Sequence, residues 1–360
     1  MGRMPSAPPL PGELPDPTAL PLVLGQSGEA ISDLQQRLTK LGHACGGGDF
    51  DVETQAAVRE FQLRRGLRQD GVVDTQSWSA IVEAGYHLGD RPLYRRRPML
   101  RGDDVAELQH RLSQLGFDSG RIDGILGDDT VSALRDFQRN AGITVDGICG
   151  HRTLDELRRL TLRRDAGSLV SPLRERLLLA TSGSRTLAGR HVGVGDAGGF
   201  ASGAASMCRA LESAGARALP LQHPDPSRRA AEANAASVDC VVDLRLRANT
   251  DECLVAYYRG FRYESLVSKQ LAHLLHDELP AALELAPGGT SGMALPILRE
   301  TRMPAVEIQL GSPALVVRRT SRLASTVVHC LESWISASWD WSSDDPQPHA
   351  QVVDQGPPTR

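Results

Sequence analysis

The first half of the chain contains an internal repeat, and this repeat constrains the fold more than any other feature. LQQRLTKLG at 34–42 returns as LQHRLSQLG at 108–116, and AAVREFQ at 56–62 returns as SALRDFQ at 132–138. Self-similarity of this kind indicates two copies of one small unit. The leucines recur at i, i+4 and i+7, which places one apolar stripe on the first helix of each copy. We therefore predict two compact bundles of three short helices, followed by a separate part of the chain.

Both copies resemble the peptidoglycan-binding domain found beside many cell-wall hydrolases. They share LQxRLxxLG, the helix that ends in FQ, and a DG turn after it. The second copy also has the turn DGILG at 123–127, which the first copy replaces with GGGDFD at 46–51. The alternative is that both bundles are helical spacers without a ligand, because fold does not dictate function. The resemblance implies that six residues of the second copy contact glycan: Asp123, Gly124, Gly127, Thr130, Asp146 and Gly147.

Composition excludes several classes of protein. Of the 360 residues, 41% are hydrophobic, which is enough for two or three domains with buried cores. A net charge of −4 gives no sign of a nucleic-acid partner. No apolar run is long enough for a transmembrane helix, and the Pro-rich start MGRMPSAPPLPGELPDPTALP lacks the apolar segment of a signal peptide. With six cysteines in no metal-type spacing, we expect a cytoplasmic protein with reduced thiols, which can act at the inner face of the membrane.

Beyond the repeats the pattern changes to strands that alternate with helices. This alternation predicts an α/β fold with a mostly parallel sheet. The expected strands are 191–196, 218–221, 240–246, 254–259 and 304–311, and the expected helices are 205–215, 227–237, 263–279 and 315–339.

Three stretches of this half resemble zinc-dependent N-acetylmuramoyl-L-alanine amidases. They are LAGRHVGVGDAGG at 187–199, RAAEANAASVDCVVDLR at 229–245 and RETRMPAVEIQLG at 299–311. In that family the corresponding stretches carry a metal-binding histidine, a second histidine at the end of an ISIH-type strand, and a catalytic glutamate in a VEVGF-type strand. A further metal-binding glutamate opens the helix after the first strand. The resemblance therefore implies an amidase-like domain.

The residues at those positions lack the required chemistry. The resemblance places Gly198 and Arg245 at the histidines and Gln309 at the catalytic glutamate, and the segment 200–211 contains no Asp, Glu or His. A catalytic zinc needs three protein ligands and a bound water. Glycine offers no side-chain ligand, arginine has no acceptor, and glutamine cannot take a proton from water as glutamate does. We expect no metal or other cofactor, and zinc only if the chain is an active amidase.

Other residues offer ways to rebuild a zinc site. Asp196 lies two residues before Gly198, and Glu307 shares a strand face with Gln309. His273 and His276 form an i, i+3 pair on a predicted helix, although such a pair is more often part of a solvated helix face.

The arginines allow two interpretations. Arg245 and Arg247, with the glycine turn after the first strand, form a candidate anion pocket for a phosphate or a carboxylate. In the competing interpretation, Arg245 pairs with an acidic neighbour and only fills space. The acidic neighbours that we consider are Asp243, Asp196 and Glu307.

The whole arrangement resembles the CwlM-type amidase homologues of actinobacteria. The shared segments are AGYHLG at 84–89, GDDVAELQ at 102–109, GICG at 147–150 and TRMPAV at 301–306. The resemblance implies a regulator of peptidoglycan precursor synthesis that stimulates the UDP-N-acetylglucosamine enolpyruvyl transferase step when phosphorylated. The implied partners are that transferase and a peptidoglycan precursor or glycan. Candidate phosphoacceptors in the tail are Ser342, Ser343 and Thr359.

Two functional hypotheses follow. The first is a non-catalytic cytoplasmic regulator or scaffold of peptidoglycan biosynthesis, and the alternative is an active amidase that cleaves the bond between N-acetylmuramic acid and L-alanine. The expected plan is a disordered Pro-rich start, two peptidoglycan-binding-like domains, a linker, an amidase-like domain and a disordered acidic tail. Their bounds are 1–24, 25–85, 99–160, 161–186, 187–339 and 340–360.

Overall fold

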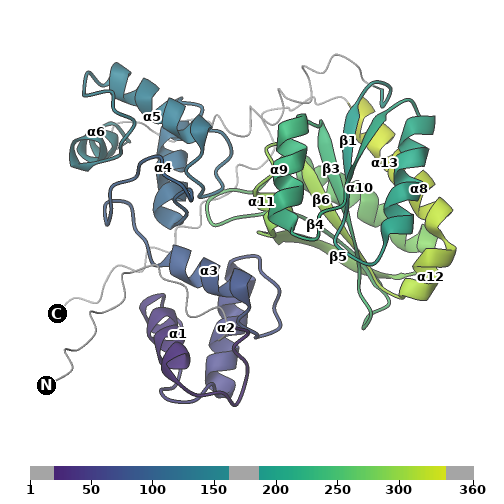
Figure 1. The fold of residues 1–360 in the computed structure, drawn as a ribbon, viewed down its shortest axis with the longest axis horizontal. Helices are drawn as coiled ribbons and strands as arrows, with labels where there is room; N and C mark the ends of the chain where they lie inside the picture. The colour runs from purple at the N-terminus through teal and green to yellow at the C-terminus, as the bar shows by residue number, and fades with distance from the viewer. Residues whose placement is uncertain (1–19, 162–185, 338–360) are drawn as a thin grey trace, which may run out of the picture.

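The computed structural model describes residues 20–161 and 186–337 (Figure 1). Almost all of the predicted linker and the entire predicted tail, with its three candidate phosphoacceptors, lie outside the described residues, as do residues 1–19 of the Pro-rich start. We call residues 20–85 module 1, residues 93–161 module 2, and residues 186–337 the amidase-like domain.

Each copy of the repeat forms three helices, as the sequence predicted. The predicted leucine stripe is buried, because Leu34 and Leu38 of module 1 and Leu108 and Leu112 of module 2 are inaccessible to solvent. Each stripe packs against the other two helices of its own module. The helices are α1 (Glu29–Lys40), α2 (Val52–Arg64) and α3 (Thr75–Ala84) in module 1, and α4 (Asp103–Gln114), α5 (Asp128–Asn140) and α6 (His151–Thr161) in module 2.

The residues of the repeated FQ and DG motifs form one hydrogen-bond network in each module. Gln138 is fully buried and donates from Nε2 to Asp146 Oδ1 at 2.8 Å and to the Ile148 carbonyl at 3.1 Å. Its Oε1 accepts from the Gly147 N–H at 2.9 Å. Gln62 makes the equivalent bonds in module 1. Because buried polar groups need partners, this network explains why both copies keep the same letters.

Each module also begins earlier than its predicted bound. Leu22 is buried and pairs with Val73 in an antiparallel bridge, although the sequence predicts a disordered start over residues 1–24. Leu93 pairs in the same way with Cys149, before the predicted bound at residue 99. In both modules an extended segment therefore closes the bundle next to the third helix, which the helical pattern did not reveal.

The amidase-like domain contains a six-stranded sheet in the order β2-β1-β3-β6-β4-β5. Strands β2, β1, β3 and β6 run parallel, β4 is antiparallel to β6, and β5 is parallel to β4. The predicted mostly parallel sheet is therefore confirmed. The strands are β1 (His191–Asp196), β2 (Arg217–Leu221), β3 (Cys240–Leu246), β4 (Glu252–Tyr258), β5 (Ala286–Met293) and β6 (Ala305–Leu310).

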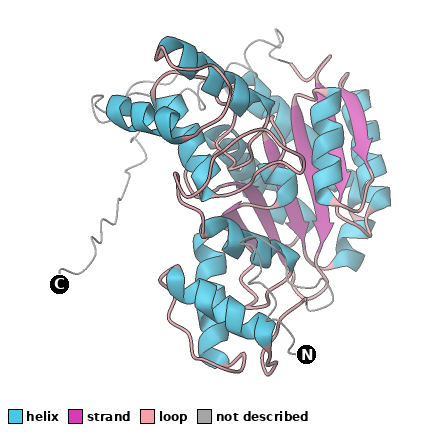
Figure 2. Cartoon of the chain, turned by 60° about the vertical axis from the view of Figure 1, so that its left-hand side comes forward, coloured by secondary structure: helices cyan, strands magenta, loops and turns pink. Residues whose placement is uncertain are grey.

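Helices cover both faces of this sheet (Figure 2). On one face α8 (Ala201–Ser213), α10 (Leu266–Leu283) and α13 (Thr320–Ser336) pack over the larger apolar cluster. On the other face α9 (Pro226–Ala236) and the short α11 (Pro296–Arg299) share a second cluster with module 2. Within the described ranges, no helix has both the length and the apolar character to cross a membrane.

The sequence missed two elements of this domain and merged two others. Strand β5 and helix α11 were not predicted, because APGGTSGM has no alternation of apolar and polar residues and α11 has only four residues. The final helix was predicted as one element over 315–339. It is instead divided into α12 (Pro313–Arg318) and α13, with Arg319 between them.

Candidate functional site

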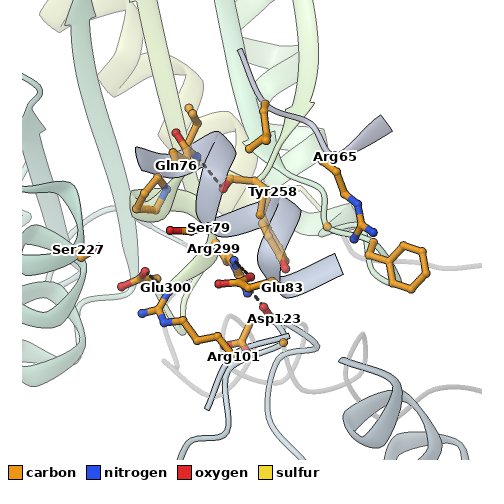
Figure 3. Close-up of a pocket in the computed structure, with 18 of the residues that line it drawn as sticks. Arg65, Gln76, Ser79, Glu83, Arg101, Asp123, Ser227, Tyr258, Arg299 and Glu300 are labelled. Atoms are coloured by element: carbon orange, nitrogen blue, oxygen red, sulfur yellow. Dashed lines mark hydrogen bonds and ion pairs between the residues drawn. The ribbon is translucent and has the colours of Figure 1, made fainter. Parts of the chain in front are cut away.

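A cavity of about 510 Å³ lies where the two modules meet the amidase-like domain (Figure 3). Module 1 contributes one side of α3 along its whole length, and module 2 contributes the start of α4 and the turn before α5. The amidase-like domain contributes Arg245 and Glu307 from the sheet, with the segment around α11. All three parts of the chain therefore form its walls.

A two-bond ion pair lies at the sheet side of this cavity. Arg245 Nε lies 3.0 Å from Glu307 Oε1, and its Nη2 lies 3.3 Å from Oε2. Gln309 Nε2 also donates to Glu307 Oε1 at 2.9 Å. Only 1% of the Glu307 side chain is exposed, against 42% for Arg245. Burial lowers the pKa of Arg245, but the Glu307 carboxylate and its hydrogen bonds raise that pKa by more, so the net shift is upward.

A second buried pair lies beside the first. Arg229 of α9 donates from Nε and Nη2 to the Asp243 carboxylate at 3.2 and 3.1 Å, and both side chains are buried. Asp243 is directly opposite Glu307 on the neighbouring strand. Burial and then the Glu307 charge raise the pKa of Asp243 to about 7. The face of the sheet below the cavity thus carries two carboxylates and two guanidinium groups, and each carboxylate forms an ion pair with one guanidinium group.

The turn after β1 contains the residues expected at the first metal position. Gly198 and Gly199 both have positive φ, at 109° and 87°. The Asp196 carboxylate accepts hydrogen bonds from the backbone N–H groups of Gly198 and Phe200, at 2.9 and 3.2 Å. The turn therefore presents no side-chain ligand, and its acidic residue is used to hold the turn itself.

These residues do not fit a catalytic zinc. Among the residues that the structure describes, no group of three or more His, Cys, Asp or Glu side chains could hold a metal ion. His273 is exposed on α10, which covers the sheet face opposite the cavity, and His276 Nε2 accepts from the Gly289 N–H at 3.0 Å. The histidines considered for a rebuilt site are therefore not brought together with Asp196 or Glu307.

The structure also favours one interpretation of the arginines. Arg245 pairs with Glu307, one of the three acidic residues considered for it. Arg247 lies one residue beyond the end of β3 and does not line the cavity. Because Arg245 is neutralised by Glu307, the two arginines do not form the anion pocket that the sequence suggested.

The residue at the position of the family's catalytic glutamate is Glu307 rather than the predicted Gln309. Strand β6 reads Val306-Glu307-Ile308-Gln309-Leu310, whose first two residues are those of VEVGF when Glu307 takes the place of the glutamate. Glu307 lines the cavity and Gln309 does not, so the predicted assignment to Gln309 lies two residues too far along the strand. The carboxylate is retained, but both of its oxygens accept hydrogen bonds from Arg245.

Arg299 joins all three parts of the chain at the cavity. It lies in α11, and its Nη1 pairs with Glu83 of module 1 at 2.9 Å. Its Nε donates to the Asp123 carbonyl of module 2 at 2.7 Å. The Glu83 charge raises the pKa of Arg299 despite burial, which acts in the opposite direction. The guanidinium therefore stays charged at the junction.

Further contacts hold module 2 on the amidase-like domain. Arg121 is buried and donates from Nη1 to the carbonyls of Leu298 and Thr301, both at 2.8 Å. Its guanidinium carbon lies 4.4 Å from the centre of the Tyr258 ring. The Tyr258 hydroxyl in turn donates to the Ile122 carbonyl at 3.1 Å. Figure 3 shows Tyr258 and Arg299 beside the module turn that contains Asp123.

The modules also contact each other and hold the edge of the sheet. Arg65 of module 1 donates two hydrogen bonds to Asp103 of module 2, at 2.8 and 2.7 Å. The Ala294 N–H, just beyond β5, donates to the Gly66 carbonyl at 2.9 Å. Both side chains of this pair are less than one fifth exposed, so losing either partner would leave a largely desolvated charge. The three parts therefore form one assembly.

The six predicted glycan contacts lie in two different environments. Asp123 and Gly124 line the junction cavity, and burial raises the pKa of Asp123. Thr130 is buried, and its hydroxyl bonds Gln109 and the Ser119 carbonyl. Gly127 is the N-cap of α5, and Asp146 and Gly147 belong to the buried glutamine network, so these three residues have structural roles. Glycan binding by any of the six residues stays a prediction.

Sequence reasoning missed the residues that join the domains. Arg299, Arg121, Glu83 and Tyr258 carry no motif, because a contact between distant segments leaves no local spacing. One indirect signal was present. The turn DGILG of module 2 is replaced in module 1, and the module 2 turn is docked on the amidase-like domain.

Comparisons with known proteins find similarities to different parts of the chain. The model of a putative peptidoglycan binding domain matches residues 27–81 and 101–157. A solved N-acetylmuramoyl-L-alanine amidase from Clostridium difficile 630 is 19% identical and has a TM-score of 0.35, over 41% of this chain and 98% of that one. The amidase CwlL of Bacillus licheniformis is 29% identical over 38% of this chain and 44% of its own length.

A longer match is found in Mycobacterium tuberculosis. The protein described as N-acetylmuramoyl-L-alanine amidase CwlM is 35% identical to this chain over 292 residues. The match spans 73% of this chain and 71% of the relative, so it extends well beyond a single module. The chain therefore belongs to the CwlM family of N-acetylmuramoyl-L-alanine amidase homologues.

Proposed function

We propose that this protein is a non-catalytic regulator or scaffold of peptidoglycan synthesis that acts in the cytoplasm. Its two modules and its amidase-like domain are used for binding rather than for hydrolysis. In this role it contacts a precursor-synthesis enzyme such as the enolpyruvyl transferase, and a peptidoglycan precursor or glycan.

The observation that carries the proposal is the ion pair between Arg245 and Glu307. An amidase of the zinc type needs a metal with an open position and a carboxylate that is free to accept a proton. Here Arg245 brings a positive charge to the place where a cation would bind, and it engages both oxygens of the glutamate. The two arrangements exclude each other electrostatically.

The docked modules support the same conclusion. Arg299 and Arg121 hold the modules over the cavity that Glu307 faces. A long polymeric substrate would need this junction to open before it reached the sheet. A binding protein, in contrast, gains a composite surface from the same arrangement.

Metal analysis and a hydrolysis assay test the proposal together. The full chain, purified and then incubated with zinc, is expected to retain no stoichiometric metal and to release no muropeptide from peptidoglycan. One zinc ion per chain, removed by a chelator with loss of muropeptide release, would establish the alternative function of an active amidase.

The regulatory role needs its own measurement. We expect the phosphorylated full chain to increase the rate of the enolpyruvyl transferase from the same organism, and the unphosphorylated chain to have less effect. Substituting Ser342, Ser343 and Thr359 by alanine, singly, identifies the phosphoacceptor among the residues predicted from sequence. An unchanged rate with every form of the chain would contradict the regulatory role without restoring hydrolysis.

A further inference from the structure

We infer that the cavity between the modules and the amidase-like domain is a binding site for an uncharged saccharide of about two sugar units, and that it exists only when both modules are docked. The inference rests on the proposed function, since it names the ligand of the same non-catalytic cleft. The isolated modules would lack this site.

The size and the walls of the cavity are the first argument. Its volume of about 510 Å³ lies within the ~300–1,000 Å³ of typical ligand sites. Ser79 of α3 and Ser227 of α9 face it from opposite sides, and Arg101 closes it from module 2 (Figure 3). No single domain supplies more than part of this enclosure, so a ligand inside it contacts three parts of the chain.

The charges of the walls exclude a strongly anionic ligand. Each arginine that lines the cavity has a carboxylate partner within about 3 Å, so a phosphate would have to displace a carboxylate from an ion pair. The lining also contains more acidic than basic residues. The pairs are Arg65–Asp103, Arg101–Glu300, Arg245–Glu307, Arg262–Glu107 and Arg299–Glu83.

Paired charges still bind hydroxyl groups. A guanidinium has five N–H donors, and the bond from Arg101 Nη1 to Glu300 Oε1 uses one of them. Sugar hydroxyls both donate and accept, so they bond to an ion pair without separating it. Gln76 and Ser79 add an amide and a hydroxyl from α3. This set of neutral and paired groups is suited to a ligand with many hydroxyls and no net charge.

Apolar contact with a sugar ring would come mainly from Phe261. Its surface is 52% exposed, and it lines the cavity together with the half-buried Leu295, whereas Ile122 and Tyr258, although part of the lining, are each only 1% exposed. The Arg65 and Arg262 guanidinium groups lie 4.7 and 4.9 Å from the centre of the Phe261 ring and hold it there. Ligand sites commonly combine such apolar walls with a few placed polar groups, and the C–H faces of sugar rings need both.

Calorimetry on the full chain tests the inference. The probes are N,N′-diacetylchitobiose and cellobiose as uncharged disaccharides, and inorganic pyrophosphate as an anion, each up to about 10 mM. We expect at least one disaccharide to bind and pyrophosphate not to bind at the cavity. Ser79→Trp and Ser227→Trp fill the cavity from opposite walls, and each should weaken disaccharide binding by about tenfold or more.

A matched control is Ser325→Trp, which places the same side chain at an exposed position of α13 on the opposite face of the sheet. It should leave binding unchanged. A thermal-unfolding midpoint close to that of the unsubstituted chain shows that each variant is folded. If one cavity variant unfolds, the other still decides the result.

Three results would overturn the inference: no heat with either disaccharide, disaccharide binding that both cavity variants leave unchanged, or tighter binding of pyrophosphate that those variants abolish. These outcomes leave the proposed function untouched as long as no zinc is bound and no muropeptide is released. Bound zinc with hydrolysis would instead refute the proposed function, whatever the saccharide result.

Discussion

Arg299 of α11 and Glu83 of α3 form an ion pair at 2.9 Å across the junction between the amidase-like domain and module 1. Both side chains are less than one fifth exposed. Arg299 also holds the Asp123 carbonyl of module 2. One side chain therefore contacts both modules.

Replacing Arg299 by alanine should release the modules. The substitution leaves Glu83 without its partner in a largely buried position, which costs about 2–4 kcal/mol. We expect a larger radius of gyration in small-angle X-ray scattering and faster proteolysis between the modules. Arg302→Ala, at an exposed position nearby, is the control. Scattering curves that do not change in Arg299→Ala would contradict the role given to this residue.

The pair between Arg245 and Glu307 should behave as a coupled unit. Arg245→Met leaves Glu307 buried without its guanidinium partner, and Glu307→Leu leaves Arg245 without its carboxylate, so each should lower the free energy of unfolding by about 2–4 kcal/mol. The double variant Arg245→Met/Glu307→Leu should lose much less than the sum of the two single changes, because neither charge is left alone. Denaturant unfolding of the three variants measures the coupling. Additive losses would show that the two groups do not interact.

Sequence reasoning predicted the elements whose signal is local. The leucine spacing of α1 and α4 predicted the modules, because a helix must bury its apolar stripe. The apolar run at 240–246 predicted β3, which is buried on both faces. Strand β5 was missed since its glycines remove the alternation on which such a prediction depends.

The candidate site depended on contacts that local patterns do not contain. Arg245 was recognised from the family resemblance, but its partner could be chosen only when the register placed Glu307 on the adjacent strand. The reversed direction of β4 and the docking of Arg299 likewise arise from packing between distant segments. For this reason the sequence did not predict the cavity.

The raised pKa of Asp243 predicts a pH dependence of stability. Its pKa is about 7 in the folded protein against an ordinary 3.8, so the folded state binds its proton more tightly. The stabilisation that the Asp243 proton gives to the folded state is fully present below pH 3.8 and is lost as pH rises toward 7. Asp243→Asn should therefore flatten the fall in stability over this range. Unfolding midpoints at several pH values test the difference in slope, with exposed Glu232→Gln as control, and parallel slopes would contradict the prediction.

Gly195 should be intolerant of even one added methyl group. A Cβ atom there would lie 1.8 Å from Asp243 Oδ1, so the carboxylate would have to leave Arg229. We expect Gly195→Ala to cost about 1–3 kcal/mol in the free energy of unfolding. At Gly193, on the same face of β1, the nearest atoms are methyl groups at 3.2 and 3.3 Å, so Gly193→Ala should cost less. Equal losses in the two variants would contradict this account.

The buried glutamine network should stabilise both modules equally. Gln138→Ala leaves the buried Gly147 N–H without its partner and removes one of the two donors to the Ile148 carbonyl, which costs about 1–3 kcal/mol. Gln62→Ala should have the same effect on module 1, because its bonds are equivalent.

Hydrogen exchange on the full chain measures each module separately. Arg139→Ala, next to Gln138 but exposed, should change protection by less than about 0.5 kcal/mol. Should Gln138→Ala leave exchange at Gly147 unchanged, the repeated letters FQ and DG would need an explanation other than folding, and ligand contact at that turn would become the stronger one.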